Sequence, residues 1–252
     1  MSERTIEIRP LHQLEEFDRC VELQHAIWSY SESDLIPRRV FLVADRIGGQ
    51  VLGAFDGDTI IGFTMGLPGY RNGHYYLHSH MMGVLDGYRN YGVGRRLKLT
   101  QREEAIARGF NLIEWTYDPL EIKNSYLNIT RLGAISRRYK RDFYGPSTSP
   151  LQGGLPTDRL YAEWWLKSDR VHAALAGTPV HQAAEQTVDV PAEIYAWKAS
   201  EENRVRAQET QMRNRDALEK AFAEGLSVVG YERDAEGNGH FQLARWNEDH
   251  MY

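Results

Sequence analysis

Hydrophobic and polar residues alternate with a period of two at "TIEIRPL", which is typical of a strand with one buried face. Further strands are predicted at "HYYLHSHMMGVL" (residues 74–85) and at "FNLIEWTY". A hairpin is predicted at "VLGAFDGDTIIGFTMGL", because the pair Asp56-Gly57 at its centre is a strong turn signal.

Apolar residues at helical spacing predict helices over 11–28, 38–45, 94–108 and 122–132. The first of these contains Cys20, which we expect to be a small buried apolar side chain. A strand, a glycine turn, a helix and a further strand follow one another from residue 74 to residue 117. Such a β-α-β unit predicts two parallel neighbouring strands. Because antiparallel hairpins precede it, we expect a mixed sheet and an α/β (α+β) fold.

The second half of the chain changes character twice. Strands are predicted at "ISRRYKRDFYG" and "RLYAEWWL", separated by the Pro-, Gly- and Ser-rich loop "GPSTSPLQGGLPTD". Beyond residue 168 the pattern predicts a short extended segment at "VDVPAEI", a polar helix over 200–224 and a terminal hairpin at "LSVVGYERDAEGNGHFQLARW". We therefore predict a first domain over 1–168 and a C-terminal extension over 169–252 whose role is open.

Composition excludes several classes of protein. Hydrophobic residues make up 42% and charged residues 26% of the chain, so a core is expected rather than disorder. The net charge of −5 argues against a nucleic-acid partner bound by broad electrostatics. A single cysteine forms no intrachain disulfide, which favours a cytoplasmic location. The stretch "MSERTIEIRPL" has no apolar core of signal-peptide length, and no apolar run approaches about 18 residues, so we expect neither a signal peptide nor a membrane span.

The stretch "GYRNYGVGRR", Gly87 to Arg96, lies between a predicted strand and a predicted helix. Glycines permit positive φ and close backbone approach, and the N–H groups and dipole at a helix amino terminus attract anions. Arg95, Arg96 and Lys98 add positive charge to the first turn, which makes better sense if an anion compensates it. We therefore predict a phosphate ligand, with an ordinary tight turn as the alternative. The dinucleotide-binding and P-loop spacings are both absent.

His78 and His80 lie two residues apart in a predicted strand and are expected to share a face. They could face solvent, pack against neighbours or act as a base. An imidazole with an ordinary pKa of about 6.5 is suited to removing a proton from an amine. A zinc site would need at least one further ligand, and no cluster with ligand spacing accompanies the pair, so we predict no metal.

Arg89-Asn90-Tyr91-Gly92-Val93-Gly94 resembles the Arg/Gln-x-x-Gly-x-Gly/Ala motif of the GNAT superfamily of acyl-CoA-dependent N-acyltransferases, and the order of elements over 4–167 is similar to that family. The resemblance implies a GNAT fold: a mixed, mostly antiparallel sheet with a splayed parallel strand pair and helices on both faces. It also implies that the pyrophosphate of acetyl-CoA or another short acyl-CoA is held by Arg89, Tyr91, Gly92, Val93, Gly94 and Arg95. The pantetheine arm would meet main-chain groups of Met82, Gly83 and Val84, with Gly83 marking the bulge that splays the strand.

The stretch "NSYLNITRLGA" resembles the second coenzyme-binding helix of the family, so Asn124 or Asn128 is expected to contact the pantetheine or the phosphates. The tyrosine that often serves as general acid would fall near Ile129 or Thr130, where this chain has none. Tyr126, about one turn earlier, is the remaining candidate. One member of the superfamily carries a similar His-x-His before its glycine motif, which makes His78 and His80 the candidate base.

Together these features predict an N-acyltransferase that moves an acetyl or short acyl group, succinyl included, to a small amine or amino acid by direct attack on the thioester. The basic residues in "RLGAISRRYKRDFYG" would be a solvated edge strand or would hold a phosphate or carboxylate. The alternative is a catalytically silent CoA-binding sensor that uses residues 169–252 as an interface. The polar helix over 200–224 is compatible with homodimer contacts or with a lid.

Overall fold

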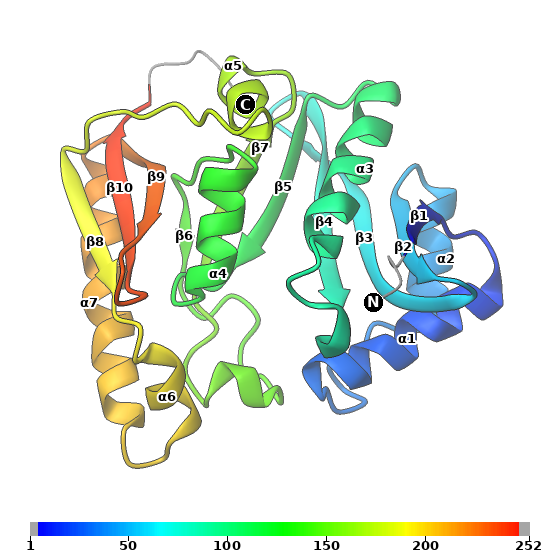
Figure 1. Ribbon diagram of the computed structural model, residues 1–252, viewed down its shortest axis with the longest axis horizontal. Coiled ribbons are helices and arrows are strands. Elements are labelled where there is room, and N and C mark those ends of the chain that lie inside the picture. The colour runs from blue at the N-terminus through cyan, green and yellow to red at the C-terminus, as the bar shows by residue number, and fades with distance from the viewer. Residues whose placement is uncertain (1–4, 247–252) are drawn as a thin grey trace. The chain divides into compact units, whose positions relative to one another are not determined.

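The computed structural model describes residues 5–246, and the chain divides into two compact units between Trp115 and Thr116. The elements that begin in the first unit are labelled in Figure 1, apart from the short helix η1. They are β1 (Ile6–Pro10), α1 (Leu14–Trp28), α2 (Arg38–Arg46), β2 (Gln50–Asp56), β3 (Thr59–Arg71), β4 (His74–Val84), η1 (Asp86–Tyr88), α3 (Val93–Ala107) and β5 (Leu112–Tyr117).

The strands of the first unit lie in the order β1-β2-β3-β4-β5. Neighbours are antiparallel from β1 to β4, whereas β4 and β5 are parallel. The hairpin between β2 and β3 turns at Gly57, whose φ of 59° lies in the left-handed region that glycine tolerates. The predicted mixed sheet is therefore confirmed, together with its one parallel pair in this unit.

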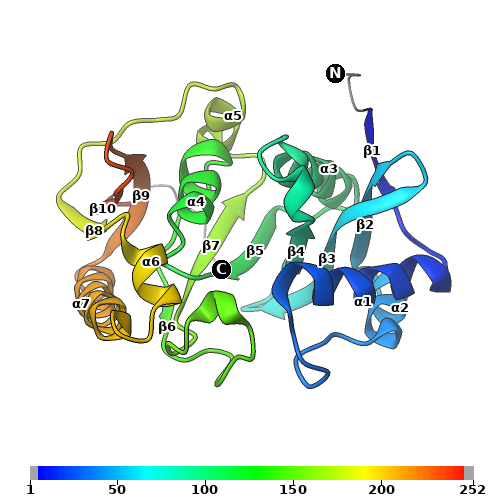
Figure 2. The same cartoon turned by 60° about the horizontal axis from the view of Figure 1, so that its bottom comes forward.

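Helices cover both faces of this sheet, as predicted (Figure 2). On one face α1 and α2 bury Phe17 and Phe41 against Phe63 of β3, with the rings of Phe41 and Phe63 5.7 Å apart. On the other face α3 packs Val93 and Leu97 against apolar residues of β2 and β3. Alternation along the strands thus supplies two separate apolar surfaces, one for each helical layer.

Strand β4 contains a β-bulge at His80. Met81 pairs with Met65 and Ser79 pairs with Gly66, so His80 is the extra residue. The expectation that Gly83 marks the bulge is wrong. Gly83 pairs regularly with Phe63, and a side chain there would come within 2.7 Å of the Trp28 ring, so close packing against α1 explains this glycine.

The parallel pairing of β4 with β5 covers Leu77 with Ile113 and His78 with Glu114, and the described register ends there. The remaining residues of β4, from Ser79 to Val84, continue along β3 alone in this unit. The two parallel strands therefore diverge at the bulge, in agreement with the predicted splay.

The second unit contains shorter elements. They are α4 (Ile122–Ser125), the π-helix η2 (Tyr126–Arg131), β6 (Tyr139–Lys140), η3 (Pro150–Gln152), β7 (Arg159–Trp165), α5 (Asp169–Leu175), β8 (Gln186–Val190), α6 (Ile194–Ala199), α7 (Arg204–Ala223), β9 (Leu226–Arg233) and β10 (Gly239–Arg245). The helix predicted over 122–132 is thus helical, but its second half has π geometry.

The strand predicted at "ISRRYKRDFYG" is reduced to Tyr139–Lys140, which pairs with β7, and to isolated bridges at Ile135 and Ser136. Arg137 and Arg138 both direct their side chains to the carboxylate of Glu163. Consecutive residues of a regular strand point to opposite faces, so this shared partner is incompatible with continuous strand geometry.

Residues 169–246 add a three-stranded sheet in the order β8-β10-β9, with α7 lying along it (Figure 1). The predicted polar helix and terminal hairpin are both present. These residues contact the earlier part of the same unit directly. The Thr130 hydroxyl donates to the Tyr231 carbonyl at 2.5 Å, and the Lys198 ammonium binds the carboxylates of Asp118 and Glu121 at 3.0 and 2.9 Å. The compact unit that holds residues 169–246 therefore begins at Thr116.

Candidate active site

The glycine turn leads from β4 through η1 into α3. Asn90 and Gly92 have φ angles of 68° and 76°, in the left-handed region, and Gly92 is the N-cap residue of α3. No side chain of the described residues caps this helix, and the first helical bond runs from the Arg96 N–H to the Gly92 carbonyl at 3.0 Å. The N–H groups of Val93 and Gly94 have no intrahelical acceptor and point out of the first turn. They are donors of the kind that bind an anion.

Gly94 is not required by the fold. Its φ is not positive, and a side chain at this position would make only an ordinary contact of 3.6 Å with the Met82 methyl group. Glycine within a helix costs about 1 kcal/mol relative to alanine. A glycine that the protein does not need for its own packing leaves room for a ligand against the first turn.

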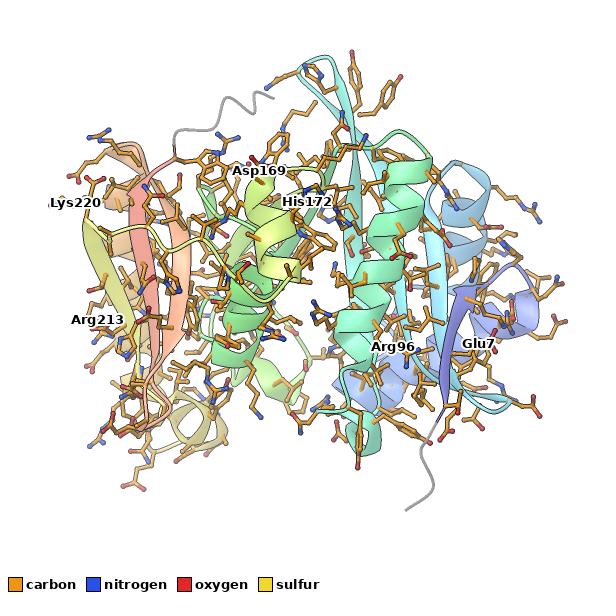
Figure 3. The ribbon with its side chains drawn as sticks, turned by 45° about the horizontal axis from the view of Figure 1, so that its top comes forward. Glu7, Arg96, Asp169, His172, Arg213 and Lys220 are labelled. Atoms are coloured by element: carbon orange, nitrogen blue, oxygen red, sulfur yellow. The ribbon has the colours of Figure 1, made fainter. Side chains whose placement is uncertain are left out.

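The cations of this region do not gather as the sequence suggested. Arg89 pairs with Asp86 at 2.8 Å, and Arg96, labelled in Figure 3, donates to the Ile6 carbonyl at 2.5 Å. Lys98 turns into the protein. The expected concentration of Arg96 and Lys98 at an anion is therefore wrong, and the main-chain amides and the helix dipole carry the anion-binding character of the turn.

His78 and His80 lie on the same side of β4, as predicted, with ring centroids 6.0 Å apart. Both are half-buried, and the residues between and before them, Ser79 and Leu77, are buried. Burial holds the pKa of His80 below its ordinary value. The imidazole of His80 is therefore neutral at pH 7 and able to accept a proton.

A buried carboxylate lies in register with His78 on the neighbouring strand. Glu114 is fully buried, and Arg71 donates to its two oxygens at 2.9 and 2.5 Å. Arg71 also lies over the Tyr76 ring, 4.9 Å from its centroid. This pairing was not predicted, because Arg71 and Glu114 are 43 residues apart in sequence.

Lys98, which we expected at an anion near the start of α3, is buried instead. Its Nζ atom lies 2.7 Å from the Ser79 hydroxyl, 3.2 Å from the Gln101 amide oxygen and 3.9 Å from the centre of the Trp115 ring. Burial lowers the pKa of this ammonium to about 7. The inward face of α3 includes Val93, Leu97, Lys98 and Gln101, a spacing typical of a buried helix face that could have revealed it.

The remaining predicted site residues differ in their exposure to solvent. In the first unit Met82 and Val84 are half-buried, Gly83 is buried and Tyr91 is exposed. In the second unit Asn124 is exposed on α4, Tyr126 is half-buried at the start of η2 and Asn128 is buried within η2. Cys20 is buried as predicted, which raises the pKa of its thiol.

Between residues 5 and 246, no three His, Cys, Asp or Glu side chains gather in an arrangement that could hold a metal ion. Over the same range, no helix combines the length and the hydropathy needed to cross a bilayer.

Comparisons with known proteins agree on the fold. The family model of the GNAT acetyltransferases matches residues 13–122. The structure resembles the ribosomal-protein-S18-alanine N-acetyltransferase of Escherichia coli (13% identity, 65% of this chain and 96% of that one, TM-score 0.53). It also resembles an N-acetyltransferase of Staphylococcus aureus Mu50 (16% identity, 65% and 99% of the two chains, TM-score 0.52).

A third similar structure is a putative acetyltransferase of Salmonella typhimurium, solved with its cofactor acetyl-CoA (16% identity, 65% and 95% of the two chains, TM-score 0.50). A comparison with the curated proteins finds no match to this chain. The matched segment contains β2, β3, the bulged strand β4 and the uncapped helix α3 described above. Residues 13–122 thus match the GNAT acetyltransferase family, and the structure has the fold of that superfamily.

Proposed function

We propose that this protein is an acyl-CoA-dependent N-acyltransferase that moves an acetyl or other short acyl group to a small amine or amino acid. One observation carries the proposal: the open first turn of α3 follows, after η1 and the glycine turn, the strand whose bulge residue is His80. An anion site and a neutral base are thereby held by one continuous segment, residues 80–94. An acyl-CoA would offer its diphosphate to the anion site and its thioester to the amine that the base deprotonates.

The coenzyme would be held mainly by the backbone. The N–H groups of Val93 and Gly94 would donate to the diphosphate, whose charge the helix dipole also favours. Arg95, half-buried in the same turn, and the exposed Arg89 and Tyr91 would line the entrance. The acetyl-CoA bound by the Salmonella protein supports this choice of ligand.

The pantetheine arm would run along the part of β4 that has left β5. Residues Met82 to Val84 would offer main-chain groups to its amides, because the described register gives them no partner on β5. A main-chain N–H of β4 near the bulge would also stabilise the oxyanion that forms during transfer. The divergence of β4 from β5 would thus serve both the binding of pantetheine and the stabilisation of the oxyanion.

Transfer itself requires a neutral amine. An ammonium has no free electron pair, so His80, directly or through water and with His78 beside it, would remove its proton. The amine nitrogen would then attack the thioester carbonyl carbon, the C–S bond would break, and the leaving thiolate would take up a proton. From the family resemblance, Tyr126 stays the candidate for this acid and Asn124 or Asn128 for further coenzyme contacts.

The basic segment after η2 bears on which acyl group the protein transfers. Arg137 and Arg138 bind Glu163, and Arg141 binds Glu219. Three of the cations considered for a succinyl or acceptor carboxylate therefore already have carboxylate partners. We accordingly place acetyl-CoA before succinyl-CoA as donor. The amine acceptor named for the Escherichia coli relative supports transfer to nitrogen.

The test is thiol release from acetyl-CoA and succinyl-CoA, measured with pooled amino acids and pooled amines, next to thermal unfolding with and without coenzyme A. We expect coenzyme A to raise the unfolding temperature and at least one acceptor pool to release thiol from acetyl-CoA. Stabilisation by coenzyme A without thiol release from any pool would favour the sensor alternative. If coenzyme A does not stabilise the protein and no thiol is released, both the acyltransferase proposal and the sensor alternative are overturned.

A further inference from the structure

Lys98 lies in the fork where β4 and β5 separate. The last residue pair of the two strands is His78 with Glu114, so Ser79 and Trp115 are the first residues beyond it. The Lys98 Nζ atom contacts both, at 2.7 Å from the Ser79 hydroxyl and 3.9 Å from the Trp115 ring centre. The ammonium thus occupies the point from which the strands diverge, and it reaches that point from α3.

The same side chain belongs to a buried polar network that holds both neighbours of His80. Lys98 donates to the Gln101 amide oxygen at 3.2 Å, and the Gln101 amide nitrogen contacts the Thr64 hydroxyl at 3.4 Å. The Thr64 hydroxyl in turn donates to the Met81 carbonyl at 3.1 Å. Ser79 on one side of the bulge and Met81 on the other are therefore both tied to α3.

We propose that Lys98 is a positioning residue, which keeps the β4–β5 fork open and fixes the bulge that orients His80. The proposal rests on the proposed function in so far as His80 is the base. It goes beyond that function because it assigns a role to a lysine to which the proposed chemistry gives no part. Helix α3 then links the diphosphate site and the base. Its first turn would bind the diphosphate, and Lys98 in its second turn would fix the orientation of the His80 imidazole.

Stability alone does not account for a lysine at this position. The partners of its ammonium are a hydroxyl, an amide oxygen and an indole ring, and within residues 5–246 no carboxylate is among them. A buried charge without a counter-charge is destabilising, and an apolar side chain of similar volume would pack there at lower cost. Residues retained against stability are expected at functional sites.

The charge state of Lys98 gives the proposal a specific signature. Burial lowers the pKa of its ammonium to about 7, so its protonation changes near neutral pH. The other titratable groups next to the fork are His78 and His80 on β4 and Glu114 on β5, whose charge Arg71 compensates. Loss of the Lys98 charge should therefore reach the two imidazoles that flank Ser79, that of His80 included.

The experiment compares Lys98→Met with Leu97→Met in the full-length protein. Both changes introduce methionine at a buried position of α3, but Leu97 packs in the apolar cluster that β1, β2 and β3 form with α3 rather than in the fork. Imidazole ¹⁵N resonances, followed between pH 5 and 8, report the titration of His80 without any substrate. Steady-state kinetics with the donor and acceptor found above report kcat and KM.

For Lys98→Met we expect a displaced His80 titration, a KM for acyl-CoA within about twofold of wild type and a kcat about 100-fold lower, the effect of misplacing a reacting group by about 1 Å. Leu97→Met should leave all three unchanged. Ser79→Ala removes the same contact without touching the lysine and should shift the His80 titration in the same direction.

A wild-type kcat together with an unchanged His80 titration in Lys98→Met would overturn the proposal. It would also be overturned if Leu97→Met changed kcat and the His80 titration as much as Lys98→Met does. If Lys98→Met does not fold, an unmoved His80 titration in Ser79→Ala would overturn it. Absence of thiol release by the wild-type protein would instead overturn the proposed function. The resonance of His80 would still test whether Lys98 sets the bulge.

Discussion

Arg71, the last residue of β3, binds both carboxylate oxygens of Glu114, a fully buried residue of β5. Glu114 is in register with His78, so this ion pair lies next to the candidate base at the last point where β4 and β5 are joined. A buried carboxylate needs such a partner, because desolvation of a lone charge is strongly unfavourable. The pair therefore stabilises the closed end of the fork.

Replacement of Arg71 by methionine should lower the free energy of unfolding by about 3–5 kcal/mol, because Glu114 is left buried without its counter-charge. Urea titration measures this loss. The double variant Arg71→Met/Glu114→Gln should recover most of it, since no unpaired charge remains. A loss in the double variant as large as that in the single one would contradict this account of the pair.

Replacement of His80 by glutamine should reduce kcat by about 100-fold or more, the usual contribution of a general base, with coenzyme affinity nearly unchanged. In the wild-type protein kcat/KM should rise as pH increases through the pKa of His80, which burial holds below its ordinary value, and should level off by neutral pH. The double variant with His78→Gln should lose more. Unchanged turnover of the double variant across pH 6–9 would rule out the pair.

Replacement of Gly94 by alanine should separate stability from binding. The free energy of unfolding should rise by about 0.5–1 kcal/mol, because alanine is the better helix former and its methyl group meets only Met82 at 3.6 Å. Affinity for coenzyme A should fall at least about tenfold, because the methyl group would occupy the space proposed for the diphosphate. Calorimetric titration and urea unfolding measure the two effects.

Gly87→Ala is the matched control, since that position also opens onto free space and its φ is not positive. It should leave the affinity for coenzyme A unchanged. Equal affinity of the Gly94→Ala variant and the wild type would remove the first turn of α3 from the coenzyme site.

Stability should depend on pH through Lys98. Its pKa is about 7 in the folded protein and ordinary in the unfolded chain, so between these values the unfolded state binds one more proton. The free energy of unfolding should therefore gain about 1.4 kcal/mol per pH unit from this residue above pH 7, until the unfolded chain also loses its proton. Unfolding at several pH values should show that Lys98→Met lacks this rise. Parallel curves for the two proteins would contradict a buried ammonium of low pKa.

Residues 169–246 should be required for folding of the second unit. Lys198→Met removes the counter-charge of the buried Asp118 and of Glu121, and should cost about 3 kcal/mol or more. Lys220→Met is the control, because Lys220 is exposed and its contact with Glu224 is 4.0 Å long. Similar stabilities of these two variants would show that the contacts of Lys198 do not hold the unit together.

Much of the fold was predictable because it is encoded locally. Period-two alternation identified β1, the Asp56-Gly57 pair identified the turn between β2 and β3, and the glycine run identified the start of α3. In each case neighbouring residues alone decide the backbone conformation or the buried face. The rings of His78 and His80 also lie near one another, with centroids 6.0 Å apart, although His80 is the bulge residue of the strand.

What the sequence by itself determined is therefore the order of the elements and the position of the glycine turn after the histidine strand. Only the tertiary structure decided that the bulge falls at His80 and not at Gly83, that Lys98 turns into the β4–β5 fork, and that Arg71 binds Glu114. Register, splay and buried ion pairs arise from contacts between residues far apart in the chain. A local pattern specifies which face is buried, but not which partner it meets.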